Sequence, residues 1–402
     1  MANVSSSNGL EKRPKLRFPG FDEPWSNVEL GSKLIPYSEI TTENNQFPPL
    51  TSSRKGLFLQ TDYFNRQVAS ENNTGYNIVP YGYFTYRHMS DDLTFYFNIN
   101  EIVEKGIVST LYPVFTTTDG LNSHFLRAYL NYSKRFASYC VLQKQGGSRT
   151  YMYFRKLCAH NAVIPSIEEQ EKIADFIDLL DQRIKLQNEK IECLKKYKRG
   201  VVFQVFKESN PFGFTVKSVP MSDLLVEYRN RNTSGLRVCS VAVNKGVVDQ
   251  IEHLGRSFSA ADTSNYGRVK PGDVVYTKSP TGSFPYGIVK QSFMKEDVAV
   301  SPLYGVYTPC SRDIGYLLHI YFEQHQNANN YIRTLAQKGA KNTINISTAH
   351  FLDKNILFPI KEENITFLAN MFYKITARIA KAEIEYDLLC SQRLTLMQQL
   401  FI

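Results

Sequence analysis

The sequence of 402 residues lacks the features that mark several common classes of protein. No apolar run approaches the roughly 20 residues of a membrane-spanning helix. The first 20 residues are polar and basic, so no secretory signal is expected. The six cysteines are scattered and form no Cys-x-x-Cys pair. We interpret them as reduced thiols of a cytoplasmic protein, which excludes a disulfide framework and a zinc site of the usual spacing.

Catalytic motifs are also absent. The sequence contains no Gly-x-Gly-x-x-Gly, no P-loop, no His-Glu-x-x-His and no Gly-x-Ser-x-Gly segment. The tetrapeptide Asn210-Pro-Phe-Gly213 partly matches a motif of adenine methyltransferases, but it lacks the second proline, and we interpret it as a helix stop. We therefore predict no catalytic residue, no metal and no cofactor in this chain, although catalytic carboxylates can lie far apart in a sequence.

Positive charge is concentrated in two stretches. The chain has 47 Lys and Arg against 38 Asp and Glu, a net charge of +9. Residues 25–167 contain 13 basic and 10 acidic residues, and residues 210–358 contain 16 and 11. Residues 168–209 and 359–402 are balanced, with nine of each sign and five of each sign. The basic excess favours an anionic partner, typically nucleic acid, over the alternative of a solvated basic surface.

The two balanced stretches are copies of one another. Apolar residues recur at alternating spacings of four and three along 173–206, and the same pattern returns 195 positions later along 368–401. This spacing predicts a coiled-coil seam. The predicted helix-pairing residues are Ile173, Ile177, Leu180, Ile184, Ile191, Leu194, Val201, Leu368, Phe372, Ile375, Ile379, Tyr386, Leu389 and Leu396.

Three polar residues interrupt this seam. They are Gln187, Lys198 and Arg393. A polar residue in a seam can fix the register of two helices at some cost in stability. For Lys198 and Arg393 the alternative is a position near the end of the seam that faces solvent, and the sequence does not decide between the two.

The repeat extends into the stretches before each helix. Val108–Phe115 is echoed by Val300–Tyr307, and Val28–Tyr37 by Val219–Tyr228. A domain followed by a long helix has therefore been duplicated. We predict an N-terminal leader over 1–24, a first mixed domain over 25–164, a first helix over 165–209, a second mixed domain over 210–358 and a second helix over 359–402.

Local signals give the fold class. Short Tyr-, Phe- and Val-rich runs between Gly, Pro and Asn breaks predict strands and loops, and His124–Tyr139 predicts one helix. Ser166 and Glu169 form a predicted capping box at the start of the first long helix, which would extend about 60 Å. The fold class is α+β, with two mixed domains joined by two long helices that form an antiparallel coiled coil with pseudo-two-fold symmetry.

The first helix region resembles a known family. The segments 164–185 (IPSIEEQEKIADFIDLLDQRIK) and 190–206, with the leader stretch 14–21 (PKLRFPGF), are similar to specificity subunits of Type I restriction-modification enzymes. The second helix region is a weaker match, because Lys361-Glu-Glu-Asn364 replaces Glu168-Glu-Gln170.

This resemblance implies a partner set. It implies that the helices pair antiparallel and that the two mixed domains, 25–164 and 210–358, are recognition domains, each of which binds one half of a split double-stranded DNA target. It also implies that the helices space the halves and dock methyltransferase subunits, expected to be two. S-adenosylmethionine would be bound by those subunits. A restriction subunit, if present, would bring ATP and magnesium.

Two glycine-bearing basic loops, each just before a long-helix region, are the first candidates for DNA contact. Glycine permits close backbone approach, while Lys and Arg bind phosphate and Arg, Gln and Asn can bind base edges. A second pair of candidates follows two strand-like runs. The candidates are Lys144, Gln145, Gly147, Ser148, Arg149 and Tyr151 in the first loop, Lys338, Gly339, Lys341, Asn342 and Thr343 in the second, and Arg87, Lys278 and Ser279.

A rival interpretation remains. A duplicated coiled-coil adaptor that binds proteins would have the same helix pattern. The basic excess on the domains and the two glycine-bearing loops favour DNA. Binding to mixed-sequence duplex DNA with a steep salt dependence distinguishes the two, because phosphate contacts release counterions.

Overall fold

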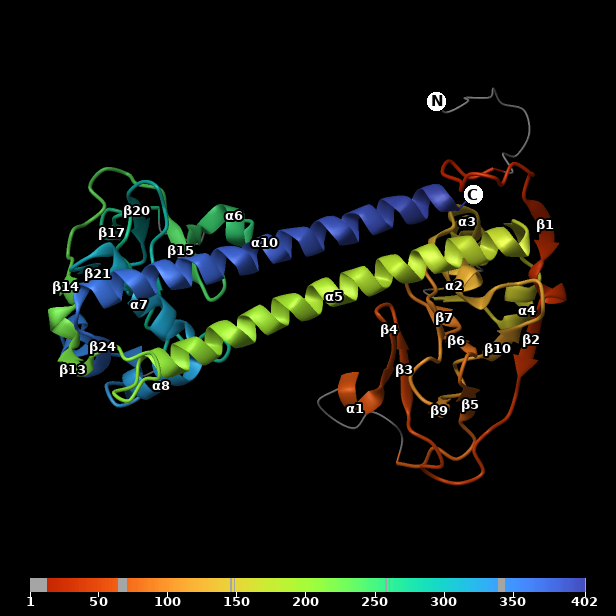
Figure 1. The fold of residues 1–402 in the computed structure, drawn as a ribbon, viewed down its shortest axis with the longest axis horizontal. Helices are drawn as coiled ribbons and strands as arrows, with labels where there is room; N and C mark the ends of the chain where they lie inside the picture. Colours follow the sequence, from red (N-terminus) through yellow and green to blue (C-terminus); the bar gives the residue numbers. More distant parts are fainter. Residues whose placement is uncertain are drawn as a thin grey trace. The chain divides into compact units, whose positions relative to one another are not determined.

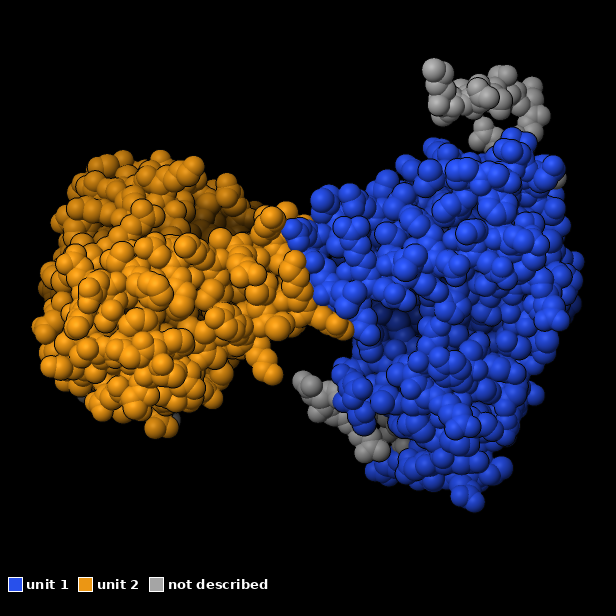
Figure 2. All heavy atoms as spheres, viewed as in Figure 1, with its two compact units in different colours: residues 1–187, 385–402 blue, residues 188–384 orange. Residues whose placement is uncertain are grey.

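The computed structural model describes residues 13–63, 71–144, 147, 149–256, 259, 261–338 and 344–401. The chain forms two compact units (Figures 1 and 2). Unit 1 contains residues 1–187 and 385–402, and unit 2 contains residues 188–384. Each unit therefore combines one recognition domain with a part of both long helices.

Unit 1 mixes short strands with short helices and ends in a long helix. Its central sheet has the strand order β2-β10-β6-β8, and three of its two-stranded sheets pair β1 with β12, β3 with β4 and β5 with β9. The elements are β1 (Ser26–Glu29), β2 (Leu34–Tyr37), β3 (Leu50–Ser53), β4 (Gly56–Leu59), α1 (Gln60–Tyr63), β5 (Asn77–Pro80), β6 (Phe84–Tyr86), β7 (Met89–Ser90), β8 (Phe97–Ile99), β9 (Lys105–Val108), β10 (Val114–Thr117), α2 (Ser123–Tyr132), α3 (Lys134–Leu142), β11 (Thr150–Tyr151), α4 (Phe154–Cys158), β12 (Asn161–Ile164) and the start of α5 (Ile167–Val205).

Unit 2 repeats the central sheet and three of the two-stranded sheets of unit 1. Its central sheet has the order β14-β21-β18-β19, and β13 pairs with β24, β15 with β16 and β17 with β20. The predicted duplication is confirmed. The elements are β13 (Val216–Pro220), β14 (Leu225–Glu227), β15 (Cys239–Ala242), β16 (Gly246–Asp249), α6 (Gln250–Leu254), β17 (Gly267–Val269), β18 (Val274–Tyr276), β19 (Val289–Gln291), β20 (Val298–Val300), β21 (Gly305–Pro309), α7 (Arg312–Glu323), α8 (His325–Ile332), β22 (Gln337–Lys338), β23 (Ile344–Asn345), α9 (Thr348–Leu352), β24 (Asn355–Pro359) and α10 (Glu362–Leu400).

Helix ends complete both cores. In unit 1, the Phe401 ring lies 5.7 Å from that of Phe125 and 6.1 Å from that of Tyr129, so the end of α10 packs on α2. In unit 2, the Phe206 ring just after α5 lies 5.1 Å from that of Tyr321 on α7. The buried residues at the two helix ends are 195 positions apart in each case: Val202, Val205 and Phe206, and Met397, Leu400 and Phe401.

The long helices pair through the predicted seam. In unit 1, Asp181 contacts Arg393, and the Gln187 side-chain amide donates to Glu385 at 3.0 Å. From Asp181 to Gln187 the numbering rises along α5, while the residues contacted on α10 fall from Arg393 to Glu385. The two helices are therefore antiparallel in this unit. In unit 2, Lys195 pairs with Glu383 at 2.9 Å. The seam residues are buried at Ile173, Ile177, Ile191, Val201, Leu368, Phe372, Ile375 and Ile379, and half-buried at Leu180, Ile184, Leu194, Tyr386, Leu389 and Leu396.

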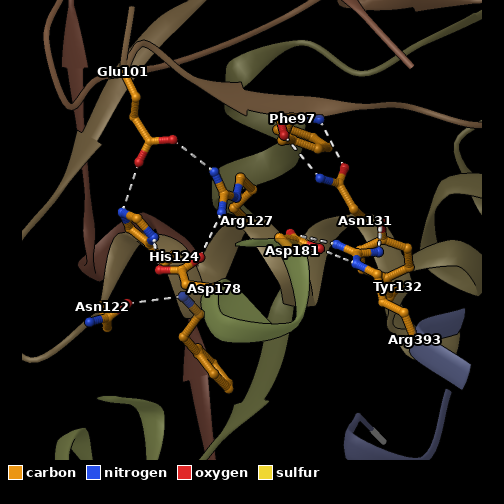
Figure 3. Close-up of polar contacts among 11 residues, drawn as sticks. Phe97, Glu101, Asn122, His124, Arg127, Asn131, Tyr132, Asp178, Asp181 and Arg393 are labelled. Carbon is orange, nitrogen blue, oxygen red and sulfur yellow. Dashed lines mark hydrogen bonds and ion pairs between the residues drawn. The ribbon is translucent and has the colours of Figure 1, made fainter. Parts of the chain in front are cut away.

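The polar seam residues have partners within the protein. Arg393 binds Asp181 and donates to the Tyr132 hydroxyl at 2.8 Å (Figure 3). Its repeat equivalent Lys198 is only 8% exposed and donates to Glu323 at 2.6 Å. Neither cation faces solvent as the alternative required. Each cation joins a long helix to the last turn of a recognition-domain helix. Arg393 contacts Tyr132 at the end of α2, and Lys198 contacts Glu323 at the end of α7.

A second polar network fixes α2 on α5. His124 contacts Glu101 at 3.0 Å and Asp178 at 2.6 Å, and Arg127 contacts the same two carboxylates at 3.1 and 3.2 Å (Figure 3). The hydrogen bond to Glu101 raises the pKa of His124 above its ordinary value, although burial opposes the shift. Asp178 belongs to α5, so this network orients the recognition domain on the helix.

Two local predictions differ from the structure. The predicted helix His124–Tyr139 is two helices, because Ser133 takes an extended conformation and its hydroxyl accepts from Phe136 N as the cap of α3. Glu169, predicted to complete a capping box, has a partner in the leader instead. Arg17 donates to both of its carboxylate oxygens at 2.8 Å. Part of the leader is thereby attached to α5.

Removal of the Arg393 side-chain charge should loosen α2. The variant Arg393→Met leaves Asp181 and Tyr132 without their shared donor, at a cost of about 1–2 kcal/mol, since Asp181 still reaches water. We expect amide exchange in α2 to accelerate roughly 5–30-fold by hydrogen-exchange mass spectrometry. Arg183→Met, at an exposed position of α5, is the control and should leave the rates unchanged. Equal rates in both variants would show that Arg393 does not hold α2.

Candidate nucleic-acid interface

A short strand pair in unit 1 brings two of the predicted stretches together. Strands β7 and β11 pair antiparallel, with Tyr151 opposite Met89 and Thr150 opposite Ser90. Beyond the pair, Met152 N donates to the His88 carbonyl at 2.8 Å. Arg87 therefore lies on the same small region as Arg149 and Tyr151, although the sequence separates them by about 60 residues. We name this region, residues 87–92 with 149–153, the β7–β11 surface.

Aromatic rings cover part of the β7–β11 surface. Tyr151 and Tyr153 stack with centroids 5.6 Å apart and an angle of 10° between the rings. His88 lies 5.1 Å from Tyr153, which is 51% exposed. Burial, and to a lesser degree the Arg87 cation, lower the pKa of His88, so its ring is neutral at pH 7. Exposed rings of this kind can stack on bases or pack against sugars.

Sequence reasoning missed Tyr153 as a member of this surface. The available signal was the alternation in Tyr151-Met152-Tyr153, where Met152 is fully buried and the two tyrosines point the other way. A strand of two residues is too short for that alternation to stand out from the other aromatic residues of the chain.

The predicted basic residues of this region that the structure describes have exposed side chains. Arg87 and Arg149 are exposed, and Lys144 is exposed two residues beyond α3. Gly147 has a φ of +67°, a backbone conformation that glycine adopts without strain, and nothing would contact a side chain there. The candidates Gln145 and Ser148 lie outside the described residues.

A hairpin adds a basic group that the sequence analysis did not select. Strands β3 and β4 form the hairpin, and Arg54 lies in its turn beside Lys55. Arg54 pairs with Asp92 and lies 5.4 Å from the centre of the Tyr96 ring. The four-residue run Ser53-Arg-Lys-Gly56 is the sequence signal, and it resembles any charged turn.

The equivalent place in unit 2 has different chemistry. Lys278 and Ser279 come after β18 in unit 2, as Arg87 and His88 come after β6 in unit 1. Lys278 is the second residue after its strand, whereas Arg87 is the first. Lys278 is half-buried with a φ of +55°, and burial lowers the pKa of its amine. Gly287 allows this turn, because a Cβ there would lie 3.0 Å from Lys278 N and 3.1 Å from Ser279 N. Ser279 is exposed.

The second basic loop belongs to a hairpin. Strands β22 and β23 pair with Lys338 opposite Ile344, whereas in unit 1 the corresponding strand β11 pairs with β7. The two loops thus occupy the same place in the chain order. The first lies between α3 and α4 and the second between α8 and α9, but the strands beside them have different partners. Gly339, Lys341, Asn342, Thr343 and the side chain of Lys338 lie outside what the structure describes.

The described residues hold neither a metal-binding cluster nor a helix suited to span a membrane. Among residues 13–63, 71–144, 147, 149–256, 259, 261–338 and 344–401, no three His, Cys, Asp or Glu side chains are grouped to hold a metal ion. No helix in the same part of the chain combines the length and apolar character needed to cross a membrane.

Comparison with known proteins gives a family model that matches part of the chain and a fold that extends over nearly all of it. Residues 32–196 match the family model of the Type I restriction modification DNA specificity domain. No curated protein matches the sequence. The S subunit of a Type I restriction-modification system from M. genitalium is 12% identical, with a TM-score of 0.55 over 97% of this chain and 99% of that one. A chain from a structure described as the basis of complex assembly and conformational transition of the type I R-M system is 14% identical, with a TM-score of 0.53 over 96% and 99%. These two likenesses show that the fold covers nearly the whole chain.

Loss of two exposed cations should change the salt dependence of DNA binding. Arg87→Ala and Lys144→Ala should each weaken binding to mixed-sequence duplex uniformly. Each should reduce the slope of log affinity against log salt by about 1, because one phosphate contact is lost. Fluorescence anisotropy over a salt series measures the slope. Lys172→Ala, at an exposed position of α5, is the control. Slopes that match the control would exclude phosphate contacts at these positions.

Proposed function

We propose that each of the two recognition domains binds one half of a bipartite DNA target, on the premise that residues 32–196 match the family model of the Type I restriction modification DNA specificity domain. The observation that carries the proposal is the repeated topology. Each recognition domain has the same strand order and is followed by a helix of 39 residues. Two domains with one topology and different surface side chains suit a target whose halves differ in sequence.

We propose that the long helices dock the methyltransferase subunits, two of them in the complete complex. Both helices expose large apolar side chains in addition to those they bury. Exposed apolar residues on paired helices are typical of surfaces that a partner covers. In unit 1 they are Leu179, Leu186, Leu388 and Leu394, and in unit 2 they are Tyr197, Phe203, Phe367 and Ile384, each 52–69% exposed.

The proposal assigns chemistry to the partners. S-adenosylmethionine would bind to the methyltransferase subunits, and ATP and magnesium to a restriction subunit where one is present. This chain would contribute recognition and assembly alone, in the cytoplasm where the host DNA is found. The complete complex would then methylate adenine in the chosen sequence and, with the restriction subunit, cleave unmodified DNA.

The rival adaptor function fits the surfaces less well. An adaptor that binds proteins needs no exposed cations beside exposed rings, whereas the β7–β11 surface has Arg87, Arg149 and Tyr153 together. Steep loss of affinity for duplex DNA between about 50 and 200 mM salt supports the DNA-binding function. Protein capture without DNA binding would support the adaptor.

Methylation should require both components. The purified chain is expected to transfer no methyl groups to DNA, because it lacks methyltransferase motifs. The chain mixed with its modification subunits and S-adenosylmethionine should methylate adenines in one split sequence. Methyl-sensitive sequencing of a plasmid library reads the outcome. Modification subunits alone are the control, and robust methylation by the isolated chain would contradict the proposal.

The helix pair should set the gap between the half-targets. An insertion of one heptad in both α5 and α10 preserves the seam, because its apolar pattern repeats every seven residues. It lengthens the pair by roughly 10 Å, or about three base pairs, and those base pairs rotate the duplex by roughly 100°. We expect methylation at the same half-targets with a longer gap and reduced affinity.

Sequencing of the methylated targets provides the measurement for the heptad insertion. An insertion of four residues in each helix, which breaks the seven-residue repeat, is the matched control and should abolish the pairing. An unchanged gap with activity retained would show that the spacing is set by something other than these helices.

A further inference from the structure

One ion pair on the β7–β11 surface leaves the far end of an arginine available. The Nε of Arg149 donates to Asp91 at 2.9 Å, and its Nη1 makes a weak contact with the Met89 sulfur at 3.7 Å. The carboxylate therefore contacts the side of the guanidinium through Nε, and the contact of Nη1 is the weak one to sulfur. Both side chains are accessible, with 51% of Arg149 and 63% of Asp91 exposed.

The backbone beside this pair is fixed. Arg149 precedes Thr150 and Asp91 follows Ser90, and Thr150 and Ser90 are paired across β7 and β11. Both are nearly buried, at 2% and 6% exposure. The ion pair thus extends from two anchored strand ends, and this limits the positions that the guanidinium can reach.

The neighbouring arginine is held differently. Arg54 pairs with Asp92 through a terminal nitrogen, Nη2, so the carboxylate occupies the end that Arg149 leaves available. Asp92 in turn accepts from Ser90 and Thr94, at 2.9 and 2.6 Å, which places it in a local turn network. Two adjacent carboxylates, Asp91 and Asp92, therefore hold two arginines in opposite ways.

We propose that Asp91 positions Arg149 to bind the O6 and N7 edge of a guanine, so that the half-target bound by unit 1 contains a guanine recognised by this arginine. The inference rests on the proposed function. End-on contact through two terminal nitrogens is the geometry by which arginine selects guanine in the major groove. A carboxylate on Nε fixes the plane of the guanidinium without occupying those nitrogens.

Stability does not explain this pair. An exposed ion pair contributes about 0–1 kcal/mol, so its loss leaves the fold intact. Repulsion of phosphate by Asp91 would also weaken non-specific binding. Asp91 thus restricts Arg149 to one orientation and weakens its general attraction to DNA. This raises discrimination between bases at the expense of affinity.

Unit 2 has no matching pair in its described residues. Residues 279–283, Ser-Pro-Thr-Gly-Ser, occupy the place of 89–93 after β18, and contain neither a carboxylate nor an arginine. The inference therefore concerns one half-target, and the other half should be unaffected by changes to Asp91.

The experiment compares variants in the full complex with modification subunits. The variants are Asp91→Ala, Arg149→Ala and Arg149→Lys, and Asp119→Ala removes an equal charge from an exposed position in another loop. Competition binding uses the cognate duplex and duplexes with single base changes. Loss of a bidentate contact reduces discrimination by roughly 5–150-fold at one position.

We expect both Arg149 variants to lose discrimination at a single guanine of one half-target, since lysine cannot make the two-nitrogen contact. Asp91→Ala should lose part of it at the same position, about 3–10-fold, with unchanged or tighter binding to mixed-sequence DNA. Asp119→Ala should keep the preference. Circular dichroism verifies folding.

Three results overturn the inference while the proposed function stands. They are an unchanged base preference in Arg149→Ala, a loss at a base other than guanine, and a loss in Arg149→Ala that Asp91→Ala does not share. Failure of the unaltered complex to select any DNA sequence would instead contradict the proposed function.

Discussion

The cores of both units depend on the packing of a helix end that belongs to a distant part of the chain. Phe401 and Leu400 close the core around Phe125 in unit 1, and Phe206 and Val205 close the core around Tyr321 in unit 2. Burial of an aromatic side chain of this size contributes about 1.5–3 kcal/mol, so neither core is complete without its helix end. A recognition domain followed by its own helix is therefore only part of a folded unit, and the last residues of the chain are needed for the fold of the first domain.

Orientation on the helices comes from polar contacts that apolar packing cannot supply. Apolar seams tolerate shifts of register, whereas Arg393 with Asp181, and Lys198 with Glu323, satisfy their charges in one arrangement only. The same positions in the two repeats use different ion pairs. Both repeats thus hold the recognition domain in a fixed orientation, although the ion pairs that do so differ. The surfaces that would contact DNA differ as well.

Much of this architecture follows from sequence because each seam has a regular period and the same seam recurs 195 positions later. The break at Ser133 did not, because apolar residues of helical spacing continue on both sides of it. The partnership of Arg17 with Glu169 joins residues 152 positions apart and leaves no local signal. For the candidate site, glycine and charge marked Arg149 and Arg87 separately. Their proximity depends on the pairing of two-residue strands, which tertiary packing decides, and the exposure of Tyr153 depends on the same pairing.

Genome-wide mapping of methylated adenines, with and without this gene, tests the central claim most directly. If the chain chooses the DNA sequence for a Type I modification complex, its deletion should remove methylation at one split motif with a fixed gap and leave other methylated motifs unchanged. Reintroduction of the gene should restore that motif. An unchanged methylation pattern in a strain that expresses the modification subunits, or the loss of an unsplit motif, would contradict the account.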